Sequence, residues 1–141
     1  MKYIIISLVS FMMTFTVLSK EILIDMLNKR DDGQRMVYSQ DIVSVSLGDT
    51  VKWLPTDPGH NVEFLAGPDG FDLPPKSFIN KETSIKFEVP GIYLYVCSPH
   101  SIMGMIGLVI VGDDTSNKEA ILAYDIGGRA NKKLKALLND I

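Results

Sequence analysis

The chain has one cysteine and two histidines in 141 residues, and their positions constrain how it can fold. Cys97 and His100 lie three residues apart, Met105 follows five residues later, and His60 lies 37 residues before Cys97. One cysteine, two histidines and a methionine are the ligands of mononuclear blue-copper centres. We therefore expect a fold that brings the loop of His60 next to the segment from Cys97 to Met105, with one copper ion between them.

Residues 22–112 have the apolar periodicity of short strands. Residues 43–47 and 84–89 alternate apolar and polar side chains, which is typical of strands with one buried face. Gly48-Asp49 and Pro90-Gly91 are turn signals that follow these two runs. The expected strands are 22–27, 43–47, 50–54, 62–65, 84–89, 92–97 and 106–111. Seven or eight short strands at this spacing predict a mainly β protein, a Greek-key two-sheet β-sandwich.

The pattern changes from strand-like to helical after Gly112. Asn117 is the expected N-cap of a helix over 119–125, which Gly127-Gly128 would end. A second helix is expected from Asn131, with apolar residues on one face at positions 134, 137 and 138. Two short helices bury too little to persist alone, so we expect them to pack against a sheet. Residues 20–141 then form one domain, with a sandwich over about 22–112 and helices over about 117–140.

Residues 1–19 have the composition of a signal peptide. Lys2 is followed by an almost wholly apolar run, and Val17-Leu18-Ser19 offers a cleavage site before the polar Lys20. An uncleaved membrane anchor is the alternative, but the run is short and no juxtamembrane linker follows it. We therefore expect a soluble periplasmic protein that does not associate with the membrane after cleavage.

The charge and cysteine content narrow the function classes further. The formal net charge is −3, and it becomes −4 when Lys2 is lost with the signal peptide. No basic stripe or arginine-rich arm is present, which argues against nucleic acid as a partner. A single cysteine in an exported protein cannot close an internal disulfide, whereas a bound metal would occupy its thiol.

The strand periodicity also predicts the orientation of the cysteine. With a period of two, Cys97 shares a strand face with Tyr93 and Tyr95, and the residues at 92, 94 and 96 face the other way. Pro99 and Gly104 are expected to make the following loop turn tightly enough for His100 and Met105 to reach one metal. His60 would come from a neighbouring strand end.

Other readings of these residues remain alternatives. A zinc site usually contains more cysteine and does not use methionine, and a binuclear copper site needs two cysteines. A hydrolase with Cys97 as nucleophile and His100 as base would lack an obvious oxyanion hole and an orienting partner. A periplasmic copper carrier or chaperone would favour a Met-rich or CxxC site that releases the metal readily.

At these residues the chain resembles the pseudoazurins, small periplasmic blue-copper proteins of the cupredoxin superfamily. The resemblance covers essentially the whole mature chain. It is carried by Met26-Leu27-Asn28-Lys29, Asp57-Pro58-Gly59-His60-Asn61-Val62-Glu63, Pro90-Gly91-Ile92-Tyr93, Cys97-Ser98-Pro99-His100 and Met103-Gly104-Met105. The two C-terminal helices are also similar, and plastocyanins lack them.

The resemblance implies a role for each of the following residues. His60, Cys97 and His100 would be the strong equatorial ligands, with Met105 as the long axial one. The backbone N–H of Asn61 would donate to the sulfur, and its side chain would join the two ligand loops. Pro99 and Met36 would lie close to the ring of His100. The metal would be one copper ion cycling between Cu(I) and Cu(II).

The resemblance also implies how electrons leave. The edge of His100 would reach solvent inside an apolar patch that includes Met103. Lys29 and Lys76 would help dock a redox partner such as copper nitrite reductase, nitrous oxide reductase, a peroxidase or a cytochrome c. Further cations at 30, 35 and 81 are candidate additions, whereas Pro58, Phe78 and Val96 stand where the family often has lysine. We expect a monomeric one-electron carrier that is not an enzyme.

Overall fold

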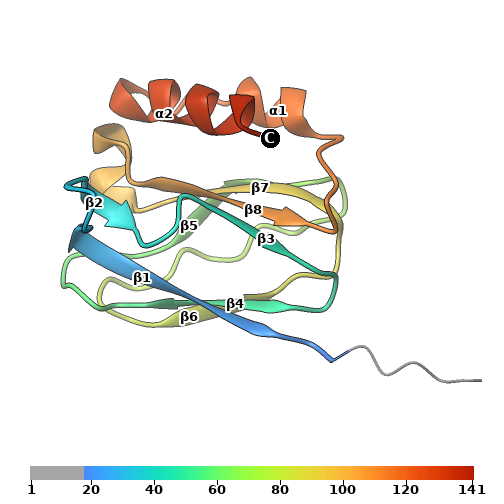
Figure 1. Ribbon diagram of the computed structural model, residues 1–141, viewed down its shortest axis with the longest axis horizontal. Coiled ribbons are helices and arrows are strands. Elements are labelled where there is room, and N and C mark those ends of the chain that lie inside the picture. Colours follow the sequence, from blue (N-terminus) through green and yellow to red (C-terminus); the bar gives the residue numbers. More distant parts are fainter. Residues whose placement is uncertain (1–17) are drawn as a thin grey trace, which may run out of the picture.

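The computed structural model describes residues 18–141, so all but the last two residues of the expected signal peptide lie outside the described part. Two four-stranded sheets face each other (Figure 1). The strands of the first sheet are, in order, β2 (Arg35–Tyr38), β1 (Glu21–Lys29), β4 (Thr50–Leu54) and β6 (Thr83–Lys86). Those of the second sheet are β3 (Ile42–Val45), β8 (Ile106–Val111), β7 (Gly91–Val96) and β5 (Glu63–Ala66).

Each sheet contains one parallel pair among antiparallel ones. β1 runs parallel to β4, and β3 runs parallel to β8. Parallel neighbours need a crossover connection, so the chain passes between the sheets instead of forming a series of hairpins. The predicted two-sheet β-sandwich is confirmed.

The strand β2 was not predicted from the sequence. It is only four residues long and begins with the exposed Arg35. Its second residue, Met36, has a φ of +52°, a conformation that a period-two pattern does not reveal. Val37 and Tyr38 are nevertheless buried, and they close the sandwich beside β1.

Both faces of β7 are buried, which places Cys97 as predicted. Tyr93, Tyr95 and Cys97 belong to the core between the sheets. The alternate residues of β7 belong to a second core beneath the helices, and they are Ile92, Leu94 and Val96. The segment that ends at Cys97 is therefore fixed by packing on both sides.

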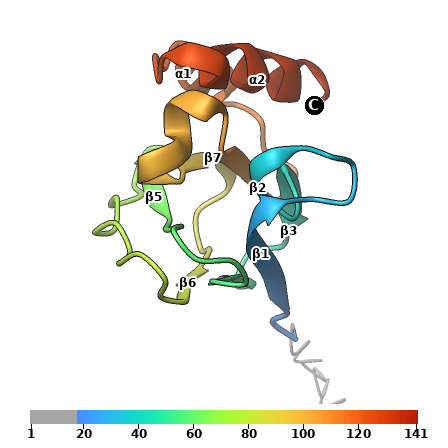
Figure 2. The ribbon, with the colours of Figure 1, turned by 90° about the vertical axis from the view of Figure 1, so that its left-hand side faces the viewer.

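The two helices cover the outer face of the second sheet (Figures 1 and 2). They are α1 (Lys118–Leu122) and α2 (Gly128–Asn139). Leu134 and Leu138 are buried against the sheet, as the helical pattern predicted. Within residues 18–141, no helix is long and apolar enough to cross a membrane.

The bounds of both helices differ from those expected, and α1 ends at Leu122 instead of Asp125. The second helix begins at Gly128 and not at Asn131, whose side-chain Oδ1 accepts hydrogen bonds from the backbone N–H groups of Ile126 and Gly127 at 2.9 and 3.0 Å. Asn117 occupies the N-cap position of α1 as predicted, but its side chain makes no capping hydrogen bond. It bonds instead to the backbone N–H and C=O of Ile92, both at 2.8 Å, and so joins the helical segment to β7.

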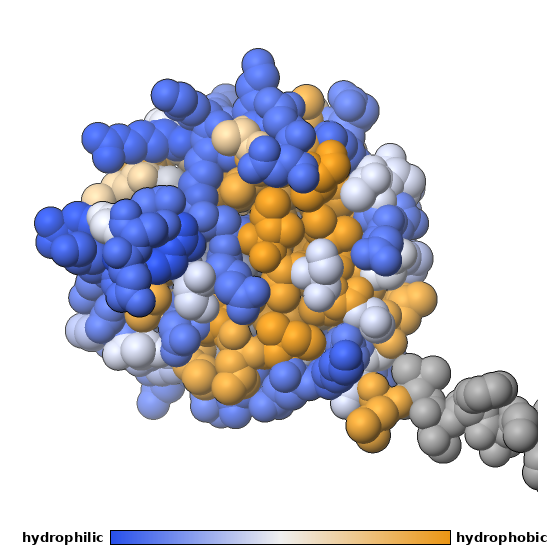
Figure 3. All heavy atoms as spheres, viewed as in Figure 1, coloured by the Kyte–Doolittle hydropathy of each residue, from blue (hydrophilic) through white to orange (hydrophobic). Residues whose placement is uncertain are grey.

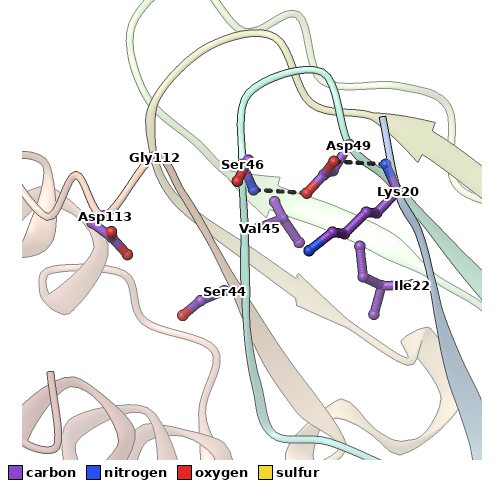
Figure 4. Close-up of a pocket in the computed structure, with 8 residues that line it drawn as sticks. All are labelled: Lys20, Ile22, Ser44, Val45, Ser46, Asp49, Gly112 and Asp113. Atoms are coloured by element: carbon purple, nitrogen blue, oxygen red, sulfur yellow. Dashed lines mark hydrogen bonds between the residues drawn. The ribbon is translucent and has the colours of Figure 1, made fainter. Parts of the chain in front are cut away.

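The Gly48-Asp49 turn closes the end of the sandwich where the described chain begins. The carboxylate of Asp49 accepts hydrogen bonds from the backbone N–H groups of Lys20 at 2.8 Å and Ser46 at 2.9 Å (Figure 4). These bonds border a pocket of about 330 Å³ that contains none of the predicted ligands. Apolar side chains also gather on the face over β1 and β3 (Figure 3).

Candidate metal centre

Two loops at one end of the sandwich carry the four predicted ligands. His60 lies between β4 and β5, Cys97 directly follows β7, and Met105 directly precedes β8. His100 lies in the short 3₁₀ helix η1 (Ser98–Met103), which faces the viewer in Figure 2. The antiparallel pairing of β5 with β7 brings the loop of His60 beside the strand end at Cys97, although 37 residues separate them.

The ligand atoms of His60, Cys97 and His100 form a nearly equilateral triangle. The Cys97 Sγ lies 3.4 Å from Nδ1 of His100 and 3.6 Å from Nδ1 of His60, and the two nitrogens are 3.2 Å apart. The centre of such a triangle is about 2.0 Å from each corner, close to the metal–nitrogen and metal–sulfur distances of about 2.0–2.3 Å in zinc sites. One first-row metal ion fits among these three atoms.

The backbone of Met105 is hydrogen-bonded to that of two other predicted ligands. Its carbonyl accepts the N–H of Cys97 at 2.9 Å, and its own N–H donates to the carbonyl of His100 at 3.2 Å. The side chain is fully buried in the same core cluster as Cys97. The fourth predicted ligand is therefore brought together with the other three.

The tight turn of η1 follows from its sequence. Pro99 occupies the first turn, where its missing N–H is not needed. The N–H of His100 donates to the carbonyl of Cys97 at 3.0 Å. Gly104 ends the turn with a φ of +100°, and its N–H donates to the carbonyl of Ser101 at 2.8 Å. The eight-residue step from Cys97 to Met105 thus folds back on itself.

The tautomer of His60 is set by Asn28, which sequence reasoning missed as a site residue. His60 Nε2 lies 2.9 Å from Asn28 Oδ1, so the amide oxygen accepts the Nε2–H and leaves a lone pair on Nδ1. Asn28 is itself held by its backbone N–H, which donates to Asp57 at 2.6 Å. The sequence signal was its position in the strand end Met26–Lys29, but only the fold shows what it contacts.

The electrostatics favour a cation between the ligands. Burial, and then the neighbouring His100, lower the pKa of His60, so the ring stays in the neutral form that binds metals. Burial also raises the pKa of Cys97. The backbone N–H groups of Asn61 and His100 favour the thiolate and oppose this rise only in part. A metal ion would stabilise the thiolate and remove the repulsion between the converging lone pairs.

Asn61 joins the two ligand loops. Its Oδ1 accepts the backbone N–H of Ser98 at 2.8 Å, and its Nδ2 donates to the Ser98 hydroxyl at 3.0 Å and to the carbonyl of Ser77 at 3.2 Å. The Ser98 hydroxyl donates in turn to Glu63 Oε2 at 2.6 Å. Glu63 and Ser98 are further site residues that the sequence did not reveal, because they meet across the β5–β7 pair.

The predicted surface residues take up different positions. His100 is half-buried, and Met103 and Ile102 beside it are 48% and 63% exposed. Lys29 and Lys76 are exposed. Met36 packs against the core cluster that contains Cys97 and Met105.

Arg30, a candidate docking cation, is instead committed to ion pairs. Its Nη2 lies 2.7 Å from Asp32 and 3.0 Å from Asp41, and these carboxylates raise its pKa further. Lys133 also contacts Asp41, at 2.6 Å. Together these residues join the β1–β2 loop to α2.

The donor set and the sandwich define a mononuclear copper protein of the cupredoxin class. A family model described as copper binding proteins, plastocyanin/azurin family, matches residues 24–112, and the chain belongs to this family. Within it, the chain is similar to the pseudoazurin of Methylorubrum extorquens, with 38% identity over 91% of this chain and 86% of the relative. A putative pseudoazurin of Rhizobium leguminosarum is 41% identical over 84% of this chain and 78% of the relative.

Solved structures agree with the sequence relatives. The crystal structure of pseudoazurin from Methylobacterium extorquens AM1 has a TM-score of 0.78 and 39% identity, covering 85% of this chain and 98% of that one. Pseudoazurin from Hyphomicrobium denitrificans gives 0.79 and 38%, covering 86% and 98%. The resemblance stated from the sequence is confirmed, and with it the expectation of a cupredoxin electron carrier that holds one copper ion.

Proposed function

We propose that the mature chain is a soluble, monomeric, periplasmic carrier of single electrons and catalyses no reaction by itself. The observation that carries this proposal is the triangle of His60, Cys97 and His100, with Met105 buried in the same core cluster as Cys97. A bound copper ion would supply a one-electron couple. Location in the periplasm is supported by the signal-like composition of residues 1–19.

The protein contributes a coordination shell that moves little between oxidation states. His60 and Cys97 are fully buried, and Asn28 and Asn61 fix the loops that carry them. In our proposal His60, Cys97 and His100 are the strong ligands and Met105 is the weak axial one. Because these side chains cannot rearrange freely, each electron transfer requires little reorganisation.

Electrons would leave through the half-buried ring of His100. The exposed side chains of Ile102 and Met103 surround this exit with apolar surface, which is easily desolvated when a partner docks. Pro99 and Met36 would limit the motion of the ring. Phe78 is 84% exposed and would enlarge this surface, because its loop is bonded to the His60 loop through Asn80.

Cations beside the exit would steer an acidic partner although the whole chain is acidic. Lys29 and Lys76 were expected in this role. Arg35 and Arg129 add to them, because both line a cleft of about 240 Å³ that also includes Met103. Copper nitrite reductase, nitrous oxide reductase, a peroxidase and a cytochrome c are partners of the required kind.

The docking proposal predicts a salt-dependent rate. Reversing both charges in a Lys29→Glu/Lys76→Glu variant should slow reduction of an acidic partner most at low ionic strength, because exposed charges are screened at high salt. Lys132→Glu/Lys135→Glu, on the exposed side of α2, is the charge-matched control. An equal effect of both variants, or no dependence on salt, would point to docking through apolar surface alone.

Voltammetry of the copper-loaded protein tests the carrier function. We expect a reversible one-electron wave at one copper per chain, and no such wave for the Cys97→Ser variant. Repeating the cycles with a Cu(I) chelator separates this function from copper carriage, the second candidate. Loss of the wave within a few cycles would show that the metal is delivered, not retained.

A further inference from the structure

Three readily oxidised aromatic side chains lie together in the core beside the metal centre. Tyr38, Tyr95 and Trp53 are each fully buried. The ring centroids of Tyr38 and Tyr95 are 4.8 Å apart, and those of Tyr95 and Trp53 are 5.1 Å apart, both with edge-on geometry. The three rings therefore form a continuous chain of contacts in the space between the sheets.

One end of this aromatic chain contacts the ligand loops. The hydroxyl of Tyr38 donates to the carbonyl of Asn61 at 2.9 Å. Asn61 follows the ligand His60, and its N–H points to the sulfur of Cys97. Tyr95 precedes Cys97 by two residues on the same face of β7. The aromatic chain thus joins Trp53 to the backbone that holds two of the ligands.

Packing alone does not explain why these rings carry polar atoms. Trp53 Nε1 and Tyr95 Oη have no hydrogen-bond partner among residues 18–141, which makes their burial costly. Burial raises the pKa of Tyr95, and the nearby indole N–H of Trp53 opposes this rise only in part. The two groups lie near each other but do not form a hydrogen bond. Phenylalanine would fill much of the same space without unpaired polar atoms.

A glycine makes room for the Tyr95 hydroxyl. A Cβ added at Gly107 would lie 2.4 Å from both Cζ and Oη of Tyr95, because β8 passes directly under the ring. The backbone of β8 therefore accommodates the full length of a tyrosine at this position. Tyr93 differs, since its hydroxyl donates to the carbonyl of Val89 at 2.6 Å and is satisfied.

We propose that Tyr38, Tyr95 and Trp53 form an internal electron relay through which the reduced metal centre restores an oxidised Trp53. A strong one-electron oxidant, such as an organic radical or a high-potential metal complex, removes one electron from the indole. The indole keeps its N–H proton, because no acceptor for it is present among the described residues. One electron from a bound Cu(I) ion would then tunnel across the rings of Tyr38 and Tyr95, which keep their O–H protons. The neutral indole would be restored, the copper would be left as Cu(II), and no bond would be broken.

This relay goes beyond the proposed carriage of electrons through His100, although it rests on the same copper site. Its route leads into the core, away from the exposed ring edge. In an oxidising compartment, this electron transfer would restore an oxidised Trp53 before the oxidation became permanent. The Cu(II) that results would be reduced again by the usual electron donor.

The test uses the fact that Trp53 is the only tryptophan in the chain. Ultraviolet light at the red edge of indole absorption ionises this side chain selectively, and transient absorption then follows the decay of its radical. The Cu(I)-loaded protein is compared with the zinc-loaded protein, because zinc accepts the cysteine and histidine ligands but has no redox chemistry. Variants Tyr95→Leu and Tyr93→Leu each remove one aromatic ring, on the same face of one strand.

We expect the radical to decay about tenfold faster or more in the Cu(I) form than in the zinc form. Tyr95→Leu should remove much of this difference, because the contact between Trp53 and Tyr38 through the Tyr95 ring is lost, whereas Tyr93→Leu should leave it unchanged. Equal decay in the Cu(I) and zinc forms, or equal effects of the two variants, would overturn the proposal. A copper-loaded sample that shows no blue band after oxidation would instead indicate failure of the copper site itself.

A second measurement needs no variant. The zinc and Cu(I) forms are exposed to a photogenerated oxidant, and peptide mass spectrometry measures oxidation at Trp53 and at the partly exposed Tyr124. We expect the Cu(I) form to protect Trp53 while Tyr124 is oxidised equally in both forms. Equal oxidation of Trp53 in both forms would contradict the relay.

Discussion

Replacing Asn28 by alanine should weaken copper binding, and the variant should still fold. Its Oδ1 accepts the Nε2–H of His60 at 2.9 Å and so aims the Nδ1 lone pair at the metal. Loss of such a partner behind a histidine ligand typically lowers metal affinity about 10–100-fold, or about 1.4–2.7 kcal/mol. The unpaired N–H would also lower the free energy of unfolding of the metal-free protein by about 1–3 kcal/mol.

Asn117→Ala is the matched control for this prediction. The Asn117 side chain also makes hydrogen bonds to a strand, two at 2.8 Å to the backbone of Ile92, but it lies under the helices. We expect a comparable loss of stability and unchanged copper affinity, measured by competition with a chelator. Equal affinities of the two variants would refute the role assigned to Asn28.

Three further changes test other parts of the structure. Met105→Gln should lower the reduction potential, because a harder oxygen ligand favours Cu(II), and a higher potential in voltammetry would contradict the axial assignment. Gly107→Ala should lower the free energy of unfolding by about 1–3 kcal/mol through overpacking against Tyr95, and denaturant titration would refute this if the midpoint stayed constant. Hydrogen bonds from the backbone N–H groups of Lys20 and Ser46 lower the pKa of Asp49, so its stabilisation is present above the ordinary carboxyl pKa and is lost as the pH falls through the lowered value. In the Asp49→Asn variant, the free energy of unfolding should therefore fall less steeply as the pH is lowered. An unchanged pH dependence would argue against a contribution from Asp49.

The ligands could be predicted from the sequence because the chain offers so few alternatives. Only one cysteine and two histidines exist, and their chemistry with a nearby methionine selects copper. The orientation of Cys97 followed from strand periodicity, which is reliable when a strand is buried on both faces between two apolar layers. Tyr93 and Tyr95 were accordingly placed on the correct side.

The residues that support the ligands could not be predicted in the same way. Asn28 contacts His60 across 32 residues, and Glu63 contacts Ser98 across 35, so both contacts depend on strand register. The strand β2 was missed because Met36 adopts a positive φ. The start of α2 was misplaced because the Asn131 side chain bonds backward to the preceding turn from within the helix.

The visible absorption spectrum of the protein titrated with Cu(II) tests the copper assignment most directly. Ligation of Cu(II) by the thiolate of Cys97 should give an intense blue charge-transfer band that saturates at one copper per chain and is absent from Cys97→Ser. A folded protein that binds the metal but shows only a faint spectrum would contradict the thiolate site. An intense band that persisted in Cys97→Ser would contradict it as well.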